Sequence, residues 1–223
     1  MGAAITRMTG HKVNLIASGR TDAGVHAVAQ VANFRTSTGI PPQGFMNGLN
    51  SMLMPGIAVI AAEEADPEFH ARTWAKGKEY LYRIVMSGCR LPLLHSRAWV
   101  INKPVDIRAM KDAAAFLTGT HDFISFAKSG SSVKTTVRTI SRIDLETVTN
   151  PEYTSLGLEE IRIKIRADGF LRCMVRNLVG FLADTGLGLK DPATTPDVLA
   201  SRDRKGAGSC APAGGLYLNR VFY

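Results

Sequence analysis

Hydrophobic and polar positions alternate along this chain with two periods, and together they predict a mixture of helices and strands. Helical spacing covers 3–8, which has a stop at Gly10 but no N-cap, and also 42–54, 106–118 between Asp106 and Gly119, 170–185, and a short stretch after Pro196. Strand-like segments are 12–18, 28–34, 56–62, 78–86, 137–145, 160–167 and 215–222. This order indicates an α+β fold with mostly antiparallel pairing.

Two of these strands carry a clear division between their faces. In 78–86, the side chains of Tyr80, Tyr82 and Ile84 share one side. In 161–166, isoleucines face one way, and the other face carries Arg162, Lys164 and Arg166. The cationic face has two interpretations, an ordinary solvated surface or a surface that contacts phosphates, and the pattern alone favours the first.

Composition and charge narrow the class of protein. With 223 residues, 45% hydrophobic and 21% charged, the chain can form one large domain or two small ones that share a core, which excludes a disordered or collagen-like protein. The formal net charge is +8, and the balance is positive in each of the stretches 1–60, 61–110, 111–150 and 151–223. The basic character therefore belongs to the folded body, and nucleic acid is the first partner to consider.

Several other classes lack their sequence signals. Cys89, Cys173 and Cys210 are odd in number and have no CxxC spacing, which favours a reducing cytoplasm over a disulfide framework or a zinc site. No apolar run approaches the roughly 20 residues of a membrane span, and the first residues do not resemble a secretion signal. The five histidines are scattered, and HExxH, GxxxxGK[ST] and GxSxG are absent. We expect a soluble cytoplasmic protein without metal or nucleotide chemistry.

Two polar loops are candidates for function. The loop 19–26 places Asp22 between two glycines, with Arg20 two residues before it. A tight turn in which Asp22 caps its own backbone is the favoured interpretation from the pattern alone, and a carboxylate open to a substrate is the alternative. The loop Ser129–Ser132, which leads to Lys134 and Arg138, is expected to be flexible, either near a phosphate backbone or as a surface turn.

The string GRTDAGVHA at 19–27 resembles the catalytic motif of the tRNA pseudouridine synthase A family. Further blocks follow in the family's order: FHAR at 69–72, KEYLYR at 78–83, GTHDFISF at 119–126, FLRCMVRN at 170–177 and GLYL at 215–218. The resemblance implies isomerisation of uridine to pseudouridine in the anticodon stem-loop of tRNA, by a homodimer that needs no cofactor or metal. It also implies two related α+β halves, with 1–70 carrying the aspartate loop and 71–223 carrying the active-site tyrosine, arginine and basic strand.

The resemblance also implies a role for individual residues. Asp22 would be the catalytic residue, and attack at C1′ of the ribose, addition at C6 of the base and a glycal route all stay open. Arg176 would form the ion pair with Asp22, since a carboxylate in a dry pocket needs a cation to stay charged. Tyr80 would stack on the target base and help to remove the C5 proton. Leu216 and Leu218 would line the pocket under the uracil, or they are plain core residues.

Basic residues would bind the RNA and help to extrude the target base. Arg20 is the best candidate for entering the vacated base position, and Arg172 is expected one turn before Arg176 on the same helix face. Looser candidates for phosphate contacts, each also open to interpretation as solvated surface, are Arg72, Lys128, Lys134, Arg138, Arg162 and Lys164.

One departure from the family bears on activity. Family members begin with a strand and a YDGxxFxGWQxQ-like block well ahead of the aspartate, whereas 21 residues precede Asp22 here. Without that block we expect an unpaired sheet edge and exposed apolar surface. A tRNA-binding remnant without turnover is therefore the second hypothesis. A glycosidase is the third, although the loop offers no second acid.

Overall fold

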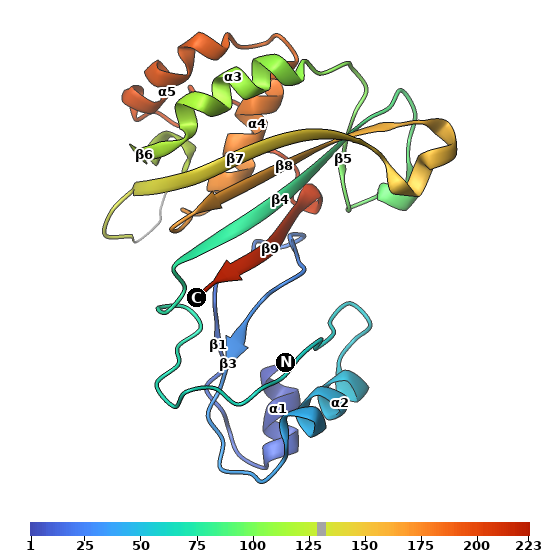
Figure 1. Cartoon of the computed structure of the whole chain (residues 1–223), viewed down its shortest axis with the longest axis vertical. Coiled ribbons are helices and arrows are strands. Elements are labelled where there is room, and N and C mark those ends of the chain that lie inside the picture. Colours follow the sequence, from blue (N-terminus) through green and yellow to red (C-terminus); the bar gives the residue numbers. More distant parts are fainter. Residues whose placement is uncertain (129–132) are drawn as a thin grey trace. The chain divides into compact units, whose positions relative to one another are not determined.

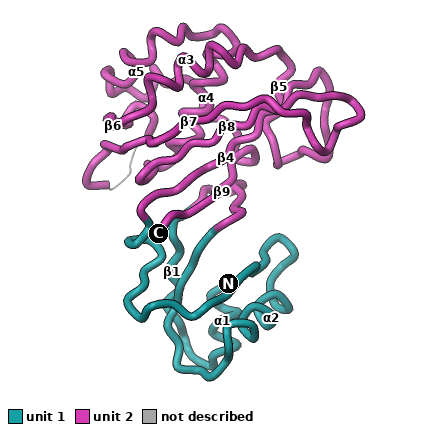
Figure 2. Tube along the Cα trace, in the orientation of Figure 1, with its two compact units in different colours: residues 1–20, 30–75 teal, residues 21–29, 76–223 magenta. Residues whose placement is uncertain are grey.

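The computed structural model describes residues 1–128 and 133–223, and it divides into two compact units (Figure 2). The smaller unit comprises residues 1–20 and 30–75, and the larger comprises 21–29 and 76–223. The predicted flexible loop at 129–132 lies outside the described residues. That the chain consists of two related halves, 1–70 and 71–223, stays a prediction, because a division into compact units does not test whether the halves are related.

The smaller unit is built around two helices. Helix α1 (Gly2–Thr9) ends at Gly10, whose left-handed backbone (φ 75°) stops it, and α2 (Pro42–Met52) begins at the predicted proline. The short strands β1 (Ile16–Ala17) and β3 (Ala32–Asn33) pair antiparallel. Ile5, Phe45 and Leu49 form the buried core of this unit.

Three predicted strands of this region are wrong in extent or type. The segments 12–18 and 28–34 contribute only the two-residue strands β1 and β3 to strand pairing within the unit. The segment 56–62 is not a strand, although its apolar residues suit one. The side chain of Asn50 takes the place of a partner strand, because it accepts from the Val59 backbone N–H (2.7 Å) and donates to the Val59 carbonyl (2.8 Å).

Among the described residues, seven strands form one mixed sheet in the larger unit, in the order β2-β9-β4-β8-β7-β6 with β5 beside β4. Their bounds are β2 His26–Ala27, β4 Gly77–Met86, β5 Trp99–Ile101, β6 Gly119–Asp122, β7 Val137–Thr149, β8 Glu159–Ala167 and β9 Leu216–Phe222. The pairs β2–β9 and β4–β5 are parallel, and the others are antiparallel. The prediction of an α+β fold with a mostly antiparallel sheet is therefore confirmed.

Helices cover one face of this sheet, as Figure 1 shows for α3, α4 and α5. Their bounds are α3 Ile107–Leu117, α4 Met174–Gly186 and α5 Thr195–Ser201. Short 3-10 turns are η1 Pro92–Leu94, η2 Ile124–Phe126, η3 Pro151–Leu156, η4 Pro192–Thr194 and η5 Ala213–Gly215. Asp106 caps α3 as predicted, since its side chain accepts from the backbone N–H groups of Arg108 and Ala109. No helix in the described part of the chain is long and apolar enough to cross a membrane.

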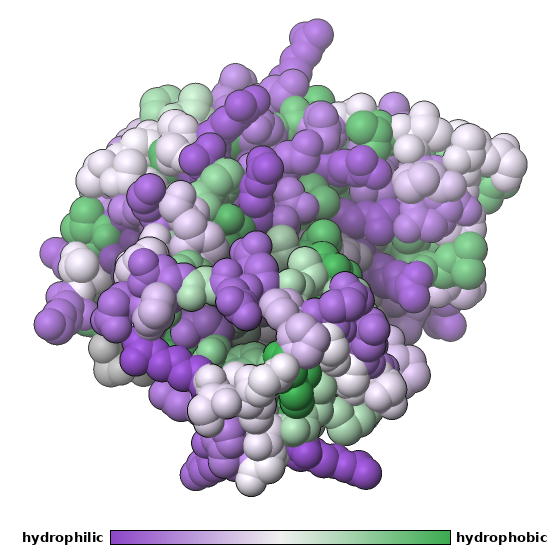
Figure 3. All heavy atoms as spheres, turned by 60° about the horizontal axis from the view of Figure 1, so that its bottom comes forward, coloured by the Kyte–Doolittle hydropathy of each residue, from purple (hydrophilic) through white to green (hydrophobic). Residues whose placement is uncertain are grey.

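The predicted division of faces is confirmed in β4 and β8. Tyr82 and Ile84 are fully buried, Tyr80 is 9% exposed, and the isoleucines of β8 are buried beside them. Burying each such side chain contributes about 1.5–3 kcal/mol, so this face holds the sheet to its helices. The surface presented in Figure 3 is mostly hydrophilic, with hydrophobic residues in separate small patches.

Helix α4 begins later than the predicted residue 170. Cys173 has a left-handed backbone (φ 59°, ψ 5°), which cannot continue an α-helix, so the first helical residue is Met174. Arg172 accordingly precedes the helix, with its side chain exposed and its carbonyl accepting from Lys128 N–H at 2.9 Å. The prediction that Arg172 lies one turn before Arg176 on the same helix face is therefore wrong.

Gly180 lets another segment of the chain approach α4 closely. A Cβ atom at this position would lie 2.0 Å from the carbonyl oxygen of Ser209 and 3.2 Å from the backbone nitrogen of Ala211. Both neighbours are backbone atoms, so they cannot move aside by a change of rotamer. The path of residues 209–211 over the helix therefore requires a glycine here.

We expect Gly180→Ala to destabilise the protein by about 1–3 kcal/mol, because the overpacking outweighs the ~1 kcal/mol that alanine contributes to a helix interior. Urea unfolding followed by circular dichroism measures the change. Gly2→Ala is the control, since a Cβ there meets nothing within 4 Å. Equal or higher stability of Gly180→Ala would contradict the close approach.

Candidate active site

Strand pairing places Asp22 beside the sheet of the larger unit. The loop that carries it runs into β2, where His26 and Ala27 pair with Tyr217 and Leu218 of β9. The turn is closed by a hydrogen bond from Val25 N–H to the Asp22 carbonyl (3.1 Å), and Gly24 has φ 82°. The expected tight turn is therefore present, but the Asp22 side chain contacts other segments instead of its own backbone.

Arg176 pairs with Asp22, as the resemblance implied. Its Nη1 lies 3.4 Å from Asp22 Oδ2, and the two side chains are 20% and 34% exposed. Its Nε donates to the Ala211 carbonyl (2.7 Å), while Ala211 N–H donates to the Arg176 carbonyl (3.0 Å). These two hydrogen bonds hold Arg176 against the backbone of Ala211, and the Nη1 of its guanidinium faces the Asp22 carboxylate.

Cys173 also contacts the carboxylate. Its Sγ lies 3.2 Å from Asp22 Oδ2, with the thiol donating. Burial and the neighbouring Asp22 carboxylate raise the pKa of the Cys173 thiol. The neutral thiol is therefore the form that faces Asp22, and one carboxylate oxygen receives two donors.

Tyr80, which lies in β4, is near the Asp22 carboxylate. Burial, and secondarily the charge of Asp22, raise the pKa of the Tyr80 phenol above its ordinary value. Its ring meets Phe170 edge-on at 5.1 Å between centroids. The phenol is therefore protonated at neutral pH. The structure thus brings Asp22, Arg176 and Tyr80 together.

Leu216 and Leu218 lie in β9 next to β4, with Leu218 paired to Tyr80 and Leu216 to Tyr82. Both side chains are buried, at 5% and 0% exposed. Gly215, directly before this strand, packs against the Tyr82 ring. A Cβ atom at this position would lie 2.6 Å from the ring. These leucines belong to the main core cluster, which also contains Tyr80.

The predicted basic residues have different surroundings. In the larger unit, Lys128 and Lys134 are exposed, and Arg138 donates to the Thr135 carbonyl (3.0 Å). Arg162 pairs with buried Glu160 at 2.9 Å, and Lys164 pairs with Glu146 at 3.1 Å. The cationic face of β8 is thus partly neutralised. Arg20 and Arg72 are exposed residues of the smaller unit.

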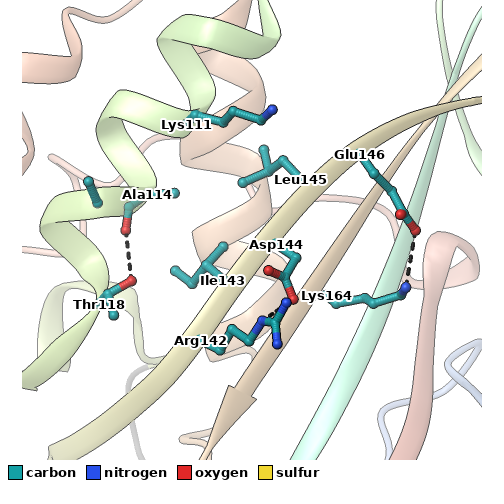
Figure 4. Close-up of a pocket in the computed structure, with 10 residues that line it drawn as sticks. Lys111, Ala114, Thr118, Arg142, Ile143, Asp144, Leu145, Glu146 and Lys164 are labelled. Atoms are coloured by element: carbon teal, nitrogen blue, oxygen red, sulfur yellow. Dashed lines mark hydrogen bonds and ion pairs between the residues drawn. The ribbon is translucent and has the colours of Figure 1, made fainter.

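A hollow of about 530 Å³ lies between α3 and β7 (Figure 4), and Asp22 is not among the residues that line it. Four of its charged residues form two pairs, Arg142 with Asp144 at 2.6 Å and Lys164 with Glu146 at 3.1 Å, and Lys111 also lines it. None of the described residues form a group of three or more His, Cys, Asp or Glu side chains that could hold a metal ion.

Sequence reasoning missed two parts of the site. Cys173 is a residue of the FLRCMVRN block, and no spacing in the sequence indicates that it contacts Asp22. The carbonyl of Ala211 is a backbone group, and its role depends on the close approach at Gly180. A glycine in the middle of an apolar helix was the one available signal.

Known proteins are similar to this chain over nearly its whole length. A family model described as tRNA pseudouridine synthase matches residues 113–223. The chain is 44% identical over 220 residues to tRNA pseudouridine synthase A of Acetivibrio thermocellus, covering 99% of this chain and 86% of the relative. It is 38% identical over 221 residues to tRNA pseudouridine synthase A of Myxococcus xanthus, covering 99% of this chain and 80% of the relative.

The mixed sheet with helices on one face is the fold of a pseudouridine synthase, an isomerase that acts on RNA. The chain belongs to the tRNA pseudouridine synthase A family.

The contact between Cys173 and Asp22 predicts a change in thiol reactivity. Iodoacetamide reacts with the thiolate, so burial and the carboxylate together should make Cys173 slower to react at pH 8 than the exposed Cys89 and Cys210. In Asp22→Asn the carboxylate charge is lost and burial remains. The pKa of the Cys173 thiol should then fall towards its ordinary value, and its alkylation should become faster.

Mass spectrometry of tryptic peptides measures the three rates separately, and Cys89 is the internal control. An unchanged Cys173 rate in Asp22→Asn would show that the carboxylate does not act on this thiol.

Proposed function

We propose that this protein isomerises uridine to pseudouridine in the anticodon stem-loop of tRNA, with Asp22 as the catalytic residue. The observation that carries the proposal is the pair of Asp22 and Arg176, held 3.4 Å apart inside the two sequence blocks that resemble the family's motifs. The reaction breaks the N-glycosidic bond and joins C5 of the base to C1′. The proton lost from C5 is balanced by one gained at N1, so no oxidant or reductant is needed.

The geometry supports a charged Asp22 that acts as nucleophile or base. Arg176 places a positive charge 3.4 Å from one oxygen of the carboxylate, and the Asp22 side chain is 34% exposed. Among the described residues of the larger unit, none donates a hydrogen bond to Asp22 Oδ1. That oxygen is therefore the one we assign to the substrate.

Tyr80 is proposed to hold the target base. Its ring offers a face or edge to a pyrimidine, and its raised pKa favours the neutral phenol. A neutral phenol supports stacking and hydrogen bonding more readily than removal of the C5 proton as a phenolate base. Leu216 and Leu218 would support Tyr80 from the neighbouring strand.

The RNA is proposed to bind through exposed cations and to release the target base from its stack, at a cost of a few kcal/mol that backbone contacts offset. Arg20 would occupy the vacated position. Phosphate contacts are better supported for the exposed cations Lys134, Lys128 and Arg72 than for Arg162 and Lys164, which already have acidic partners.

We also propose that the enzyme works in the cytoplasm as a homodimer. Cys89, Cys173 and Cys210 are all free, which suits a reducing compartment. The dimer follows from the family resemblance, and sedimentation equilibrium measures it directly.

Asp22→Asn tests the proposed function. Replacing the carboxylate with a neutral amide of the same shape should reduce the single-turnover rate of pseudouridine formation by at least about 10³-fold, since the reaction loses its nucleophile or base. Dissociation constants for a tRNA transcript, measured at one fixed salt concentration, should change little because RNA affinity resides in the cations. Base-specific chemical detection of pseudouridine at the anticodon stem measures the product.

Asp168→Asn is the control, since this carboxylate accepts a hydrogen bond from Thr139 N–H outside the site. Salt-sensitive tRNA binding by the wild-type chain with no product would favour the binding-remnant hypothesis. Hydrolysis of a sugar substrate, unaffected by competing tRNA, would favour the glycosidase.

A further inference from the structure

The thiol of Cys173 donates a hydrogen bond to the Asp22 carboxylate. Its Sγ lies 3.2 Å from Oδ2, within the ordinary range for a sulfur donor, and the two residues are separated by 151 positions in the sequence. The contact therefore depends on the fold and not on chain proximity.

The backbone of Cys173 makes this contact at a conformational cost. A left-handed backbone is uncommon for a residue with a Cβ atom, and Cys173 (φ 59°) sits at the point where the chain turns into α4. Asn177 N–H donates to the Cys173 carbonyl at 3.0 Å, which ties the residue to the first turn of the helix. The helix start thus fixes the direction of the Cα–Cβ bond that carries the thiol.

Two donors converge on the same carboxylate oxygen. Oδ2 receives the thiol of Cys173 and Nη1 of Arg176 at 3.4 Å, while Oδ1 accepts from no described residue of the larger unit. With Oδ2 held from two directions, rotation of the carboxylate about its χ2 angle is restricted. Oδ1 then points in one direction.

We propose that Cys173 is a positioning residue, whose thiol holds Asp22 Oδ2 so that Oδ1 is aimed at the uridine. This role rests on the proposed function of Asp22. Arg176 supplies the charge that balances the carboxylate, and Cys173 supplies a second, uncharged restraint on its orientation.

The chemistry of the thiol suits this role. Burial and the adjacent carboxylate raise the pKa of Cys173, so the thiol keeps its proton and remains a donor at neutral pH. A thiolate in the same place would instead repel the carboxylate. The other charged or titratable groups that act on Cys173 are Arg176 and Cys210, of which Cys210 is exposed.

The test is the single-turnover rate of three variants on a tRNA transcript. Cys173→Ala removes the donor and should slow the reaction about fivefold to tenfold, the size expected for a weak hydrogen bond to a charged group. Cys173→Ser keeps a donor at this position and should recover most of the rate. The half-saturating tRNA concentration should stay within about twofold of wild type in both, because the thiol orients the carboxylate and does not bind RNA.

Cys173→Gly separates orientation from folding. Glycine adopts the left-handed backbone freely, so this variant should unfold at a denaturant concentration equal to or higher than wild type, yet react as slowly as Cys173→Ala. Cys89→Ala is the matched control, since this exposed cysteine lies beside Ser87, with 3.4 Å between its Sγ and the Ser87 Oγ, and it should react at the wild-type rate.

Wild-type rates in Cys173→Ala and Cys173→Gly would overturn the positioning role. A slow Cys173→Ser variant with the same loss as Cys173→Ala would also overturn it, since a donor would then not matter. Failure of the proposed function itself looks different: the wild-type chain would form no pseudouridine, or Asp22→Asn would remain active.

Discussion

Arg176 joins the parts of the molecule on which the proposed chemistry depends. Through its side chain it reaches Asp22 on the loop before β2, and through its side chain and backbone it binds Ala211 on the segment before β9. A guanidinium can do this because its donors lie in a rigid plane and point in different directions. One residue on the first turn of α4 therefore sets both the position of the carboxylate and the path of the chain behind it.

The sheet supplies the rigidity that this arrangement needs. β9 lies between β2 and β4, so the strand that carries Leu216 and Leu218 also anchors the Asp22 loop on one side and Tyr80 on the other. Helix α4 packs on the same face through buried apolar residues, and Gly180 admits the 209–211 segment against it. A carboxylate, a cation, a thiol and a phenol from three separated segments thus meet on one rigid support.

The sequence predicted the larger unit well because its signals are periodic and locally capped. The alternation in β4 and β8 located the buried face, and Asp106 located the start of α3. Prediction failed where one long-range or backbone contact overrides the pattern. The Asn50 side chain replaces a strand partner for Val59, and the left-handed Cys173 delays the start of α4. Asp22, Tyr80 and Arg176 were found through the family resemblance. The contact of the Cys173 thiol with Asp22 and the hydrogen bonds between Arg176 and Ala211 have no signal in the sequence and are seen only in the structure.

The most direct test of the central claim compares Arg176→Gln with Arg172→Gln in single-turnover formation of pseudouridine on a tRNA transcript. Arg172 is the matched control, because it is an arginine four residues earlier, exposed and outside the helix. We expect a loss of at least about 100-fold for Arg176→Gln, as when an electrostatic partner of the reacting group is removed, and a rate close to wild type for Arg172→Gln. Full activity of Arg176→Gln, or an equal loss in both variants, would contradict this role of Arg176.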